Sequence, residues 1–387
     1  MNGRGARARR LLAAATLAIA AAARCGDDAT PVPPPVACEP APGLICTVAG
    51  TGIAGDGADD LAALATRLYL PQDVTIGPDG RLYIVDWNNH RIRVRRDDGS
   101  LHIVAGIGEL GPSSDDPSTN RLNHPTQVTF DPAGNLVIAA WHNSRIKTVD
   151  PATGELLDVC GTGARGFAGD GGPAAAAVLN LPVAVVFDAA GNMLISDQAN
   201  DRVRKVDAAT GMISTIAGVG PCGTCPLGDD GPATGAFISL PQGQSARPAG
   251  RIDIDAAGNL YVADTVNNRV RKIDAAGVIT TIAGNGQIGA TGDGGPATEA
   301  TLSGLADVAV GPDGIYVADT GNSCVRIIRD DGTIATVAGL CGSAGLAGDD
   351  GPATEARLDR PGGIALDAAG NLYIADTHNQ RVRVVYR

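Results

Sequence analysis

The chain has 387 residues, of which 44% are hydrophobic, 19% are charged and 53 are glycine, and its formal net charge is −12. This hydrophobic content is enough to bury a core, which excludes a disordered chain, and the glycines lack the three-residue period of collagen. Nucleic-acid binding depends on clustered Lys and Arg, so the acidic balance argues against a nucleic-acid partner. Beyond the N-terminus no apolar run reaches about 18 residues, which argues against a polytopic membrane protein.

Residues 1–24 have the pattern of an export signal. Four arginines precede an uncharged stretch at 11–23, which is the charged-then-apolar order of a secretory signal peptide. A helix of about 13 residues is too short to span a bilayer. Removal of residues 1–24 takes away five Arg and no acidic residue, so the mature protein is more acidic than the full chain. We therefore expect an exported protein.

The signal ends at Ala22-Ala23-Arg24-Cys25, which resembles a bacterial lipoprotein cleavage site whose Cys becomes the lipidated first residue. Arg24 departs from the small residue that this motif places before the Cys. Two outcomes stay open, a lipid anchor on Cys25 at the cell envelope and plain secretion, including release into the periplasm. The anchor would be the protein's contact with a membrane. Residues 25–45 are Pro-rich and predict a stiff, extended tether.

Residues 46–387 contain one motif in six copies, and the repeat decides the fold. In the first copy, strands are predicted at 72–76, 82–85 and 91–94, and a fourth follows the turn at 97–99. A Gly after Asp or Ala separates the first two strands and supplies the positive φ that short hairpins need. Four antiparallel strands per copy, repeated radially, predict an all-β, six-bladed β-propeller.

The strand count also predicts how the ring closes. A fourth-strand segment at 46–50 precedes the first complete copy, and the last copy stops after its third strand at Arg387. Six copies of every strand exist only if the N-terminal segment completes the last blade. We therefore predict that this segment pairs there and removes an unpaired edge.

Long loops join each fourth strand to the next copy. They contain Gly-Asp-Gly or Asp-Asp-Gly, and in four copies a Pro follows, which predicts a single helical turn. Carboxylates and loop carbonyls suit calcium, but each loop offers one or two acids and lacks a run of alternating ligands. Calcium is therefore an unfavoured alternative, and we otherwise expect no cofactor and no metal.

The segment 264–273, Asp-Thr-Val-Asn-Asn-Arg-Val-Arg-Lys-Ile, leads to Ile282-Ala283-Gly284 and then to Gly-Asp-Gly-Gly-Pro at 292–296. This pattern resembles the NHL repeat, and the resemblance covers residues 46–387. It implies a six-bladed propeller. NHL propellers include extracytoplasmic sensor domains, teneurin-type surface domains, RNA-binding regulators and a zinc-dependent peptide-amidating lyase, so the fold does not decide the function.

Residues that recur in nearly every copy are expected to serve the blade. Asp86, Asn89 and Arg91 of the first copy have counterparts in most others. We interpret the Asp and the Arg as a paired contact at the strand end and the Asn as a turn residue.

Departures from the repeat point to a binding site. Both tryptophans and three of the five histidines lie in the turns between the second and third strands of copies 6, 1 and 2. In copy 2, Ala140 replaces the recurring Asp, which leaves the following Arg without its expected partner. Ring closure makes these blades neighbours, so we expect an arc of exposed aromatic and cationic groups that recognises a protein or a small ligand. The alternative is that each Trp packs on the adjacent long loop. The candidate binding residues are Trp87, His90, Trp141, His142, Arg145 and His378.

Enzyme chemistry has weak support in the sequence. The five histidines form no His-x-His or His-Glu-x-x-His spacing, and Gly-x-Ser-x-Gly is absent. Gluconolactonase-like propellers hold a metal on carboxylates in the central channel, and no such acids are identified outside the repeating set. We therefore expect a monomeric, non-catalytic binding or scaffold propeller outside the cytoplasmic membrane, with no catalytic residues. A metal-dependent hydrolase or lyase that uses the channel is the alternative.

The cysteine pattern favours an oxidising compartment. Without Cys25, seven thiols remain, which is an odd number. One pair is a Cys-x-x-Cys in a loop insertion, one joins the ends of adjacent strands, and one flanks the closing strand. The expected disulfides are Cys38–Cys46, Cys222–Cys225 and Cys324–Cys341. Cys160 is left as a buried free thiol.

Overall fold

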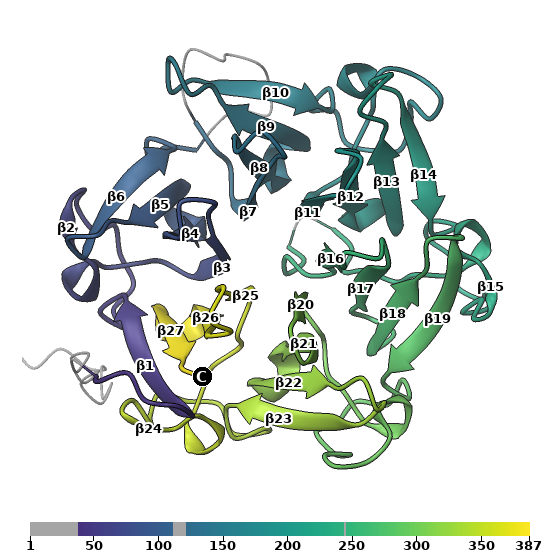
Figure 1. Ribbon diagram of the computed structural model, residues 1–387. Coiled ribbons are helices and arrows are strands. Elements are labelled where there is room, and N and C mark those ends of the chain that lie inside the picture. The colour runs from purple at the N-terminus through teal and green to yellow at the C-terminus, as the bar shows by residue number, and fades with distance from the viewer. Residues whose placement is uncertain (1–37, 111–120, 244) are drawn as a thin grey trace, which may run out of the picture. The chain divides into compact units, whose positions relative to one another are not determined.

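A computed structural model describes residues 38–110, 121–243 and 245–387. The predicted signal peptide, Cys25 and most of the predicted tether lie outside these residues. The described chain forms six antiparallel sheets arranged around a central axis, as a six-bladed β-propeller (Figure 1). The predicted all-β class and the predicted number of blades are therefore confirmed. Within the same ranges, no helix is long and apolar enough to cross a membrane.

Blades 1 to 3 each have four main strands, and the first strand lies nearest the axis. Blade 1 contains β3 (Pro71–Ile76), β4 (Leu82–Asp86), β5 (Arg91–Arg95) and β6 (Ser100–Ala105). Blade 2 contains β7 (Pro125–Phe130), β8 (Leu136–Ala140), β9 (Arg145–Val149) and β10 (Leu156–Cys160). Blade 3 contains β11 (Pro182–Phe187), β12 (Met193–Asp197), β13 (Arg202–Val206) and β14 (Ile213–Ala217).

Blades 4 to 6 follow the same plan. Blade 4 contains β16 (Ile252–Ile254), β17 (Leu260–Asp264), β18 (Arg269–Ile273) and β19 (Val278–Ala283). Blade 5 contains β20 (Asp307–Gly311), β21 (Gly314–Asp319), β22 (Cys324–Ile328) and β23 (Ile334–Ala338). Blade 6 contains β25 (Ile364–Leu366), β26 (Leu372–Asp376), β27 (Arg381–Val385) and the N-terminal β1 (Leu44–Ala49). Short outer strands β2 (Leu61–Ala62), β15 (Gly231–Pro232) and β24 (Gly351–Pro352) extend blades 1, 4 and 6.

Strand β1 closes the ring. It pairs antiparallel with β27, with Ile45 opposite Val385 and Thr47 opposite Arg383. The N-terminal strand is therefore the outer strand of the last blade, and the two ends of the propeller share one sheet (Figure 1). The closure that the strand count predicts is confirmed.

A single tight turn joins the second and third strands of most blades. In blade 1 it is a 3-10 turn, η2 (Trp87–Asn89), and His90 follows it with a φ of 53°. The glycine that ends the fourth strand packs directly against this turn, because a Cβ on Gly106 would lie 2.1 Å from the His90 carbonyl oxygen. Only glycine leaves the backbones room to approach so closely.

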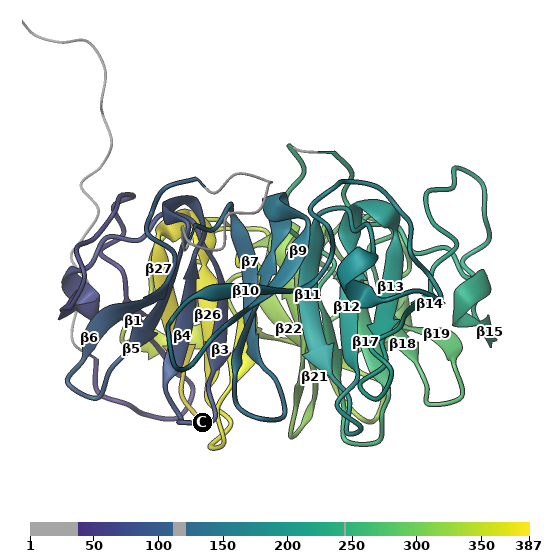
Figure 2. The same cartoon turned by 90° about the horizontal axis from the view of Figure 1, so that it is seen from above.

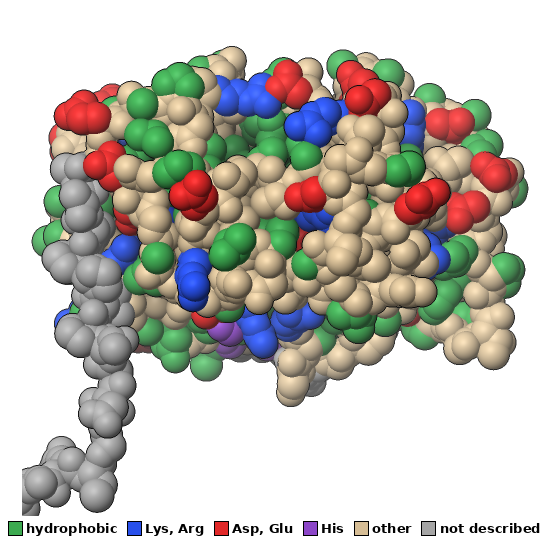
Figure 3. Space-filling view, turned by 90° about the horizontal axis from the view of Figure 1, so that it is seen from below, with side chains coloured by type: hydrophobic (Ala, Val, Ile, Leu, Met, Phe, Trp, Pro, Cys, Tyr) green, Lys and Arg blue, Asp and Glu red, His purple; other side chains and the backbone are tan. Residues whose placement is uncertain are grey.

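The turns between the second and third strands lie at the same end of the blades as the inter-blade loops. A hydrogen bond of 2.9 Å from Asn89 Nδ2 to the Gly55 carbonyl joins the two in blade 1. We call this side the loop face, and the short hairpin turns occupy the opposite face (Figure 2). Acidic, basic and hydrophobic side chains are interspersed over the outer wall (Figure 3).

The helical turns that the sequence predicts in the inter-blade loops are single 3-10 turns. They are η1 (Ala63–Ala65), η5 (Ala174–Ala176), η7 (Ala233–Gly235), η8 (Ala297–Glu299) and η10 (Ala353–Glu355).

Candidate binding site at the mouth of the channel

In every blade except blade 2, the repeated Asp is the centre of a buried hydrogen-bond network. In blade 1, Asp86 accepts hydrogen bonds from the Tyr69 N–H at 2.8 Å, from Asn89 Nδ2 at 2.9 Å and from Arg93 Nε at 2.8 Å. The Asp86 and Arg93 side chains are both fully buried. A buried carboxylate with three donors is well satisfied, so this network holds the blade together.

The partner of the repeated Asp differs from the predicted one. Arg91 lies opposite Asp86 in the strand register, yet the ion pair is formed by Arg93, two residues further along the same face of β5. The Arg91 guanidinium instead extends toward the loop and donates to the Ile107 carbonyl at 3.1 Å. The prediction was wrong in this respect because register alone does not show how far a long side chain reaches.

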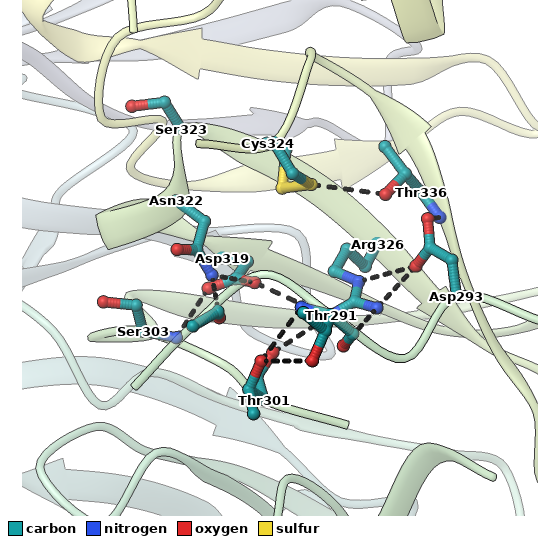
Figure 4. Close-up of a disulfide and its surroundings, with 12 residues drawn as sticks. Thr291, Asp293, Thr301, Ser303, Asp319, Asn322, Ser323, Cys324, Arg326 and Thr336 are labelled. Atoms are coloured by element: carbon teal, nitrogen blue, oxygen red, sulfur yellow. Dashed lines mark hydrogen bonds and ion pairs between the residues drawn. A yellow bond between two sulfur atoms is a disulfide. The ribbon is translucent and has the colours of Figure 1, made fainter. Parts of the chain in front are cut away.

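The aspartates of the Gly-Asp-Gly loops also bind blade arginines. Asp56 accepts a hydrogen bond of 3.1 Å from Arg93 Nη2. Figure 4 shows the arrangement in blade 5, where Arg326 binds Asp293 while Asp319 accepts from Asn322 and from the Ser303 N–H. In the blades other than blade 2, these loop carboxylates are therefore engaged by guanidinium groups. The other pairs are Arg204–Asp170, Arg271–Asp229 and Arg383–Asp349.

Blade 2 departs from this scheme, and Arg145 is not the free cation that the sequence predicts. Arg145 is buried, and its Nη1 lies 2.8 Å from Asp158 Oδ2. Lys147, at the position of Arg93, binds the same carboxylate. Asp158 is on the fourth strand, directly opposite Lys147, and replaces the carboxylate lost at Ala140. The prediction of an Arg145 without its partner was wrong because the replacement carboxylate, Asp158, lies on another strand.

Trp141 is not exposed either, which corrects the predicted arc. Only 1% of its surface is accessible, and its Nε1 donates to Gln198 Oε1 of blade 3 at 3.2 Å. Its ring stacks on His142 at 4.2 Å between centroids. Trp141 therefore packs against blade 3 and joins a core cluster that residues of blades 3 and 4 form.

His124 connects the remaining predicted aromatic residues, although it is not among the predicted site residues. Its ring centroid lies 4.6 Å from Trp87, 4.4 Å from His90 and 4.7 Å from His142. Burial, together with the charges of His90 and His142, lowers the pKa of His124 to about 3. The His124 imidazole is therefore neutral at pH 7. We call His90, His124 and His142 the histidine stack.

A cavity of about 200 Å³, which we call the mouth cavity, opens on the loop face at the channel axis. Trp87 and His378, both predicted, line it together with Arg247 and Arg360. Burial and the charge of Arg360 lower the pKa of Arg247. The structure thus brings two of the predicted residues to one cavity and adds two arginines that the sequence analysis missed.

A sequence signal for the missed arginines does exist. The residue before the proline that leads into the innermost strand has a left-handed backbone in several blades, with φ of 52° at Leu70, 51° at His124, 55° at Leu181 and 50° at Arg360. Arg360 is the cation among these equivalent positions. Arg247 lies in an insertion between Pro241 and Gly250 that other copies lack. Comparison of the copies at this position would have identified Arg360.

A second cavity, of about 220 Å³, lies deeper in the channel and is acidic. Asp73, Asp253 and Asp307, from the innermost strands of blades 1, 4 and 5, line it. No channel acids were predicted from the sequence outside the repeating set, and these three residues correct that prediction. Burial raises the pKa of Asp253 and Asp307 to about 6 and that of Asp73 to about 8.

Arg251 separates the two cavities. It is fully buried, and its Nη2 donates to the carbonyls of Gln72 at 2.9 Å and Thr126 at 2.8 Å. Gln72 lines the mouth cavity, and Asp73, whose carboxylate lies 3.9 Å from Arg251 Nε, lines the deeper one. One guanidinium therefore ties blade 4 to blades 1 and 2 across the channel.

The cysteines form three disulfides in the structure, the same pairs that the sequence predicts, and Cys160 is a buried free thiol. Cys324 occupies the position of Arg91 in blade 5 (Figure 4). Among the described residues, one group of side chains has the spacing of metal ligands. It consists of Asp59, Asp60 and His102, on the surface of blade 1.

The model of the NHL repeat matches residues 68–94 and 358–385, which are the innermost three strands of blade 1 and of blade 6. With six blades of the same plan, these matches decide the family. The chain is a six-bladed NHL-repeat propeller.

Curated relatives of this NHL propeller are much longer proteins. Teneurin-1 of Gallus gallus is 29% identical over an alignment of 380 positions, which covers 89% of this chain and 14% of the relative. The chloroplastic protein SUPPRESSOR OF QUENCHING 1 of Arabidopsis thaliana is 28% identical over 59% of this chain and 22% of the relative. The chain thus spans less than a quarter of the length of either relative.

Solved structures show the same fold at low sequence identity. A protein of unknown function from Bacteroides thetaiotaomicron has a TM-score of 0.64 and 17% identity, covering 88% of this chain and 75% of its own. An auxiliary nutrient binding protein from Bacteroides ovatus has a TM-score of 0.62 and 16% identity, covering 88% and 76%. At such identity the likeness concerns the fold alone.

Proposed function

We propose that this NHL propeller is a non-catalytic binding protein that acts outside the cytoplasmic membrane and holds its ligand in the mouth cavity. The observation that carries the proposal is the pair of arginines, Arg247 and Arg360, that line the cavity beside the indole of Trp87. In the blades, buried arginines are matched with aspartates. A concave site at the axis, where loops of several blades converge, is a favourable place for a ligand.

The compartment is inferred from the chemistry of the chain. Three disulfides are stable in an oxidising environment, which agrees with the predicted export signal. The solved auxiliary nutrient binding protein supports a binding role by analogy of fold only. A lipid anchor on Cys25 and plain secretion both remain compatible with this proposal.

The ligand can be sought by native mass spectrometry of the protein purified from envelope or secreted fractions. We expect a bound small molecule or partner that is lost in Trp87→Ala, because this change removes a wall of the mouth cavity. Val266→Ala is the matched control, since Val266 is exposed and does not line the cavity. Equal occupancy in Trp87→Ala and in the wild type would contradict the proposed site.

The alternative function, a metal-dependent hydrolase or lyase, would use the acidic cavity. Its carboxylates are already engaged, since Asp253 accepts N–H groups of Ile254 and Val310 at 2.8 and 2.7 Å. Asp307 likewise accepts from the Ile364 N–H at 2.9 Å. Elemental analysis tests this alternative, because a stoichiometric metal that is lost in Asp253→Asn would favour it over a binding protein.

A further inference from the structure

We propose that the ligand of the mouth cavity is a small organic anion with two acidic groups, carboxylate or phosphate, on an apolar body, and that Arg247 and Arg360 bind these groups. This inference rests on the proposed function and names the chemical class of its ligand.

The first argument is the imbalance of charge in the mouth cavity. Arg204 and Arg271, in blades 3 and 4, are fully buried, and each pairs with a buried Asp and with a loop Asp. Arg247 and Arg360 instead line one cavity, where burial and the charge of Arg360 lower the pKa of Arg247. An acidic ligand would supply the missing counter-charges through charge-assisted hydrogen bonds.

The second argument is that the backbone directs both arginines to the mouth. Arg360 has a left-handed backbone, and its N–H donates to Ser323 Oγ at 3.2 Å, which fixes the direction of the chain before β25. Gly304 occupies the equivalent place in blade 5. A Cβ there would lie 2.6 Å from Arg247 Nη2, so this glycine leaves the space that the Arg247 guanidinium occupies.

The third argument is the apolar wall beside these charges. Trp87 is half-buried and is held by His124 at 4.6 Å and by Trp141 at 6.4 Å between ring centroids. Its Nε1 is buried and has no hydrogen-bond partner among the described residues. An aromatic surface next to cationic groups fits a ligand with a flat or apolar body.

The other polar groups of the mouth cavity leave the two arginines as the main anchors. The hydroxyls of Thr320 and Thr377 already donate to the carbonyls of Pro361 and Pro71, both at 2.8 Å. His378 is partly exposed, and its partial burial together with the charges of Arg360 and Arg247 lowers its pKa, although the neighbouring Asp359 acts in the opposite direction. These groups shape the site, and the positive charge comes from Arg247 and Arg360.

The test uses three meta-disubstituted benzenes as probes: isophthalate, 1,3-phenylene bisphosphate and the neutral isophthalamide. Binding is measured by isothermal titration calorimetry and by tryptophan fluorescence on the full mature chain. We expect wild type to bind isophthalate or 1,3-phenylene bisphosphate more tightly than isophthalamide, and the stronger of the two acidic probes identifies the acidic group. Arg247→Met and Arg360→Met should each weaken that binding about 10- to 100-fold.

Arg329→Met is the matched control, since Arg329 is exposed in a hairpin on the opposite face and does not line the mouth cavity. It should leave binding unchanged. A thermal melt without probe separates ligand binding from a structural role. Arg247→Met should melt at the wild-type temperature or above it, because it removes one of two like charges, whereas a structural arginine would lower the melting temperature.

Two results would overturn the inference in distinguishable ways. If isophthalamide binds as tightly as the acidic probes, with binding lost in Trp87→Ala but retained in both arginine variants, the ligand is neutral and the proposed site stands. If no probe binds to wild type and Trp87→Ala loses no co-purified ligand, the anion inference and the proposed function both fail.

Discussion

Arginine serves opposite purposes in the blades and at the mouth of the channel. Arg93 is fully buried and bound to Asp86, so its charge is balanced within the blade. Arg247 and Arg360 are exposed at the axis, where the charge that Arg247 faces is that of Arg360. The repeat therefore uses paired charges for stability, and we propose that Arg247 and Arg360 at the mouth serve binding. Loss of a blade residue should affect folding, and loss of a mouth residue should affect binding.

Removal of β1 should have the largest effect on the blades. A chain that begins at Thr51 loses the outer strand of blade 6 and leaves β27 as an open edge. We expect it to aggregate or to melt far below the intact protein, as measured by circular dichroism. A chain that begins at Cys38 keeps β1 and should melt like the intact protein. Equal melting of the two chains would show that β1 contributes nothing to closure.

Breaking a blade network should have the next largest effect. Arg204→Met leaves the fully buried Asp197 without its cationic partner, which should cost about 3–5 kcal/mol of unfolding free energy. Denaturant titration measures this loss. Arg247→Met makes the same replacement, arginine by methionine, at the mouth of the channel and should leave the free energy of unfolding unchanged. Similar losses in the two variants would remove the distinction between the two regions.

Blade 2 offers a smaller version of the same test. Asp158→Ala leaves Arg145 and Lys147 buried without their shared carboxylate, and because Asp158 is one-third exposed we expect a loss of about 2 kcal/mol. Asp97→Ala, which breaks the exposed pair with Arg81, should change stability little. An equally small effect of Asp158→Ala would mean that blade 2 does not depend on the replacement carboxylate.

The same contrast explains what the sequence could predict. The fold and its closure were predictable because six copies can be aligned and their strands counted. Trp87 and His378 were found as departures from that alignment, and both reach the mouth cavity. The burial of Trp141 and the pairing of Arg145 could not be found in this way, because Gln198 belongs to another blade and Asp158 to another strand.

The channel acids were missed for a different reason. Asp73, Asp253 and Asp307 lie on the innermost strands, whose sequence pattern is mainly that of apolar strands. The three carboxylates form one acidic cavity because blades 1, 4 and 5 meet at the axis, and an alignment of the copies does not show which blades meet. The signal was nevertheless present, since each of the three acids is next to a buried apolar residue of a strand that faces the channel, namely Val74, Ile252 or Val308.

The histidine stack joins the two regions and should give the smallest effect, one that depends on pH. The pKa of His124 is lowered from 6.5 to about 3, so between these values the folded protein binds fewer protons there than the unfolded chain. The contribution of the neutral His124 imidazole to the free energy of unfolding is fully present above pH 6.5. It is lost progressively as the pH falls toward 3. Because His124 is only partly buried, we expect a loss of about 1 kcal/mol between pH 7 and pH 5.

The difference between wild type and His124→Phe isolates this loss. Phe keeps an aromatic ring beside Trp87 but cannot take up a proton, so the variant should lose less stability than wild type when urea titrations at pH 7 and pH 5 are compared. His102→Phe is the control, since His102 lies on the surface beside Asp59 and Asp60, away from the stack. A pH dependence that is identical in wild type and His124→Phe would show that the stack accepts protons without cost. The indole that lines the mouth cavity would then be held by packing alone and not by a neutral imidazole.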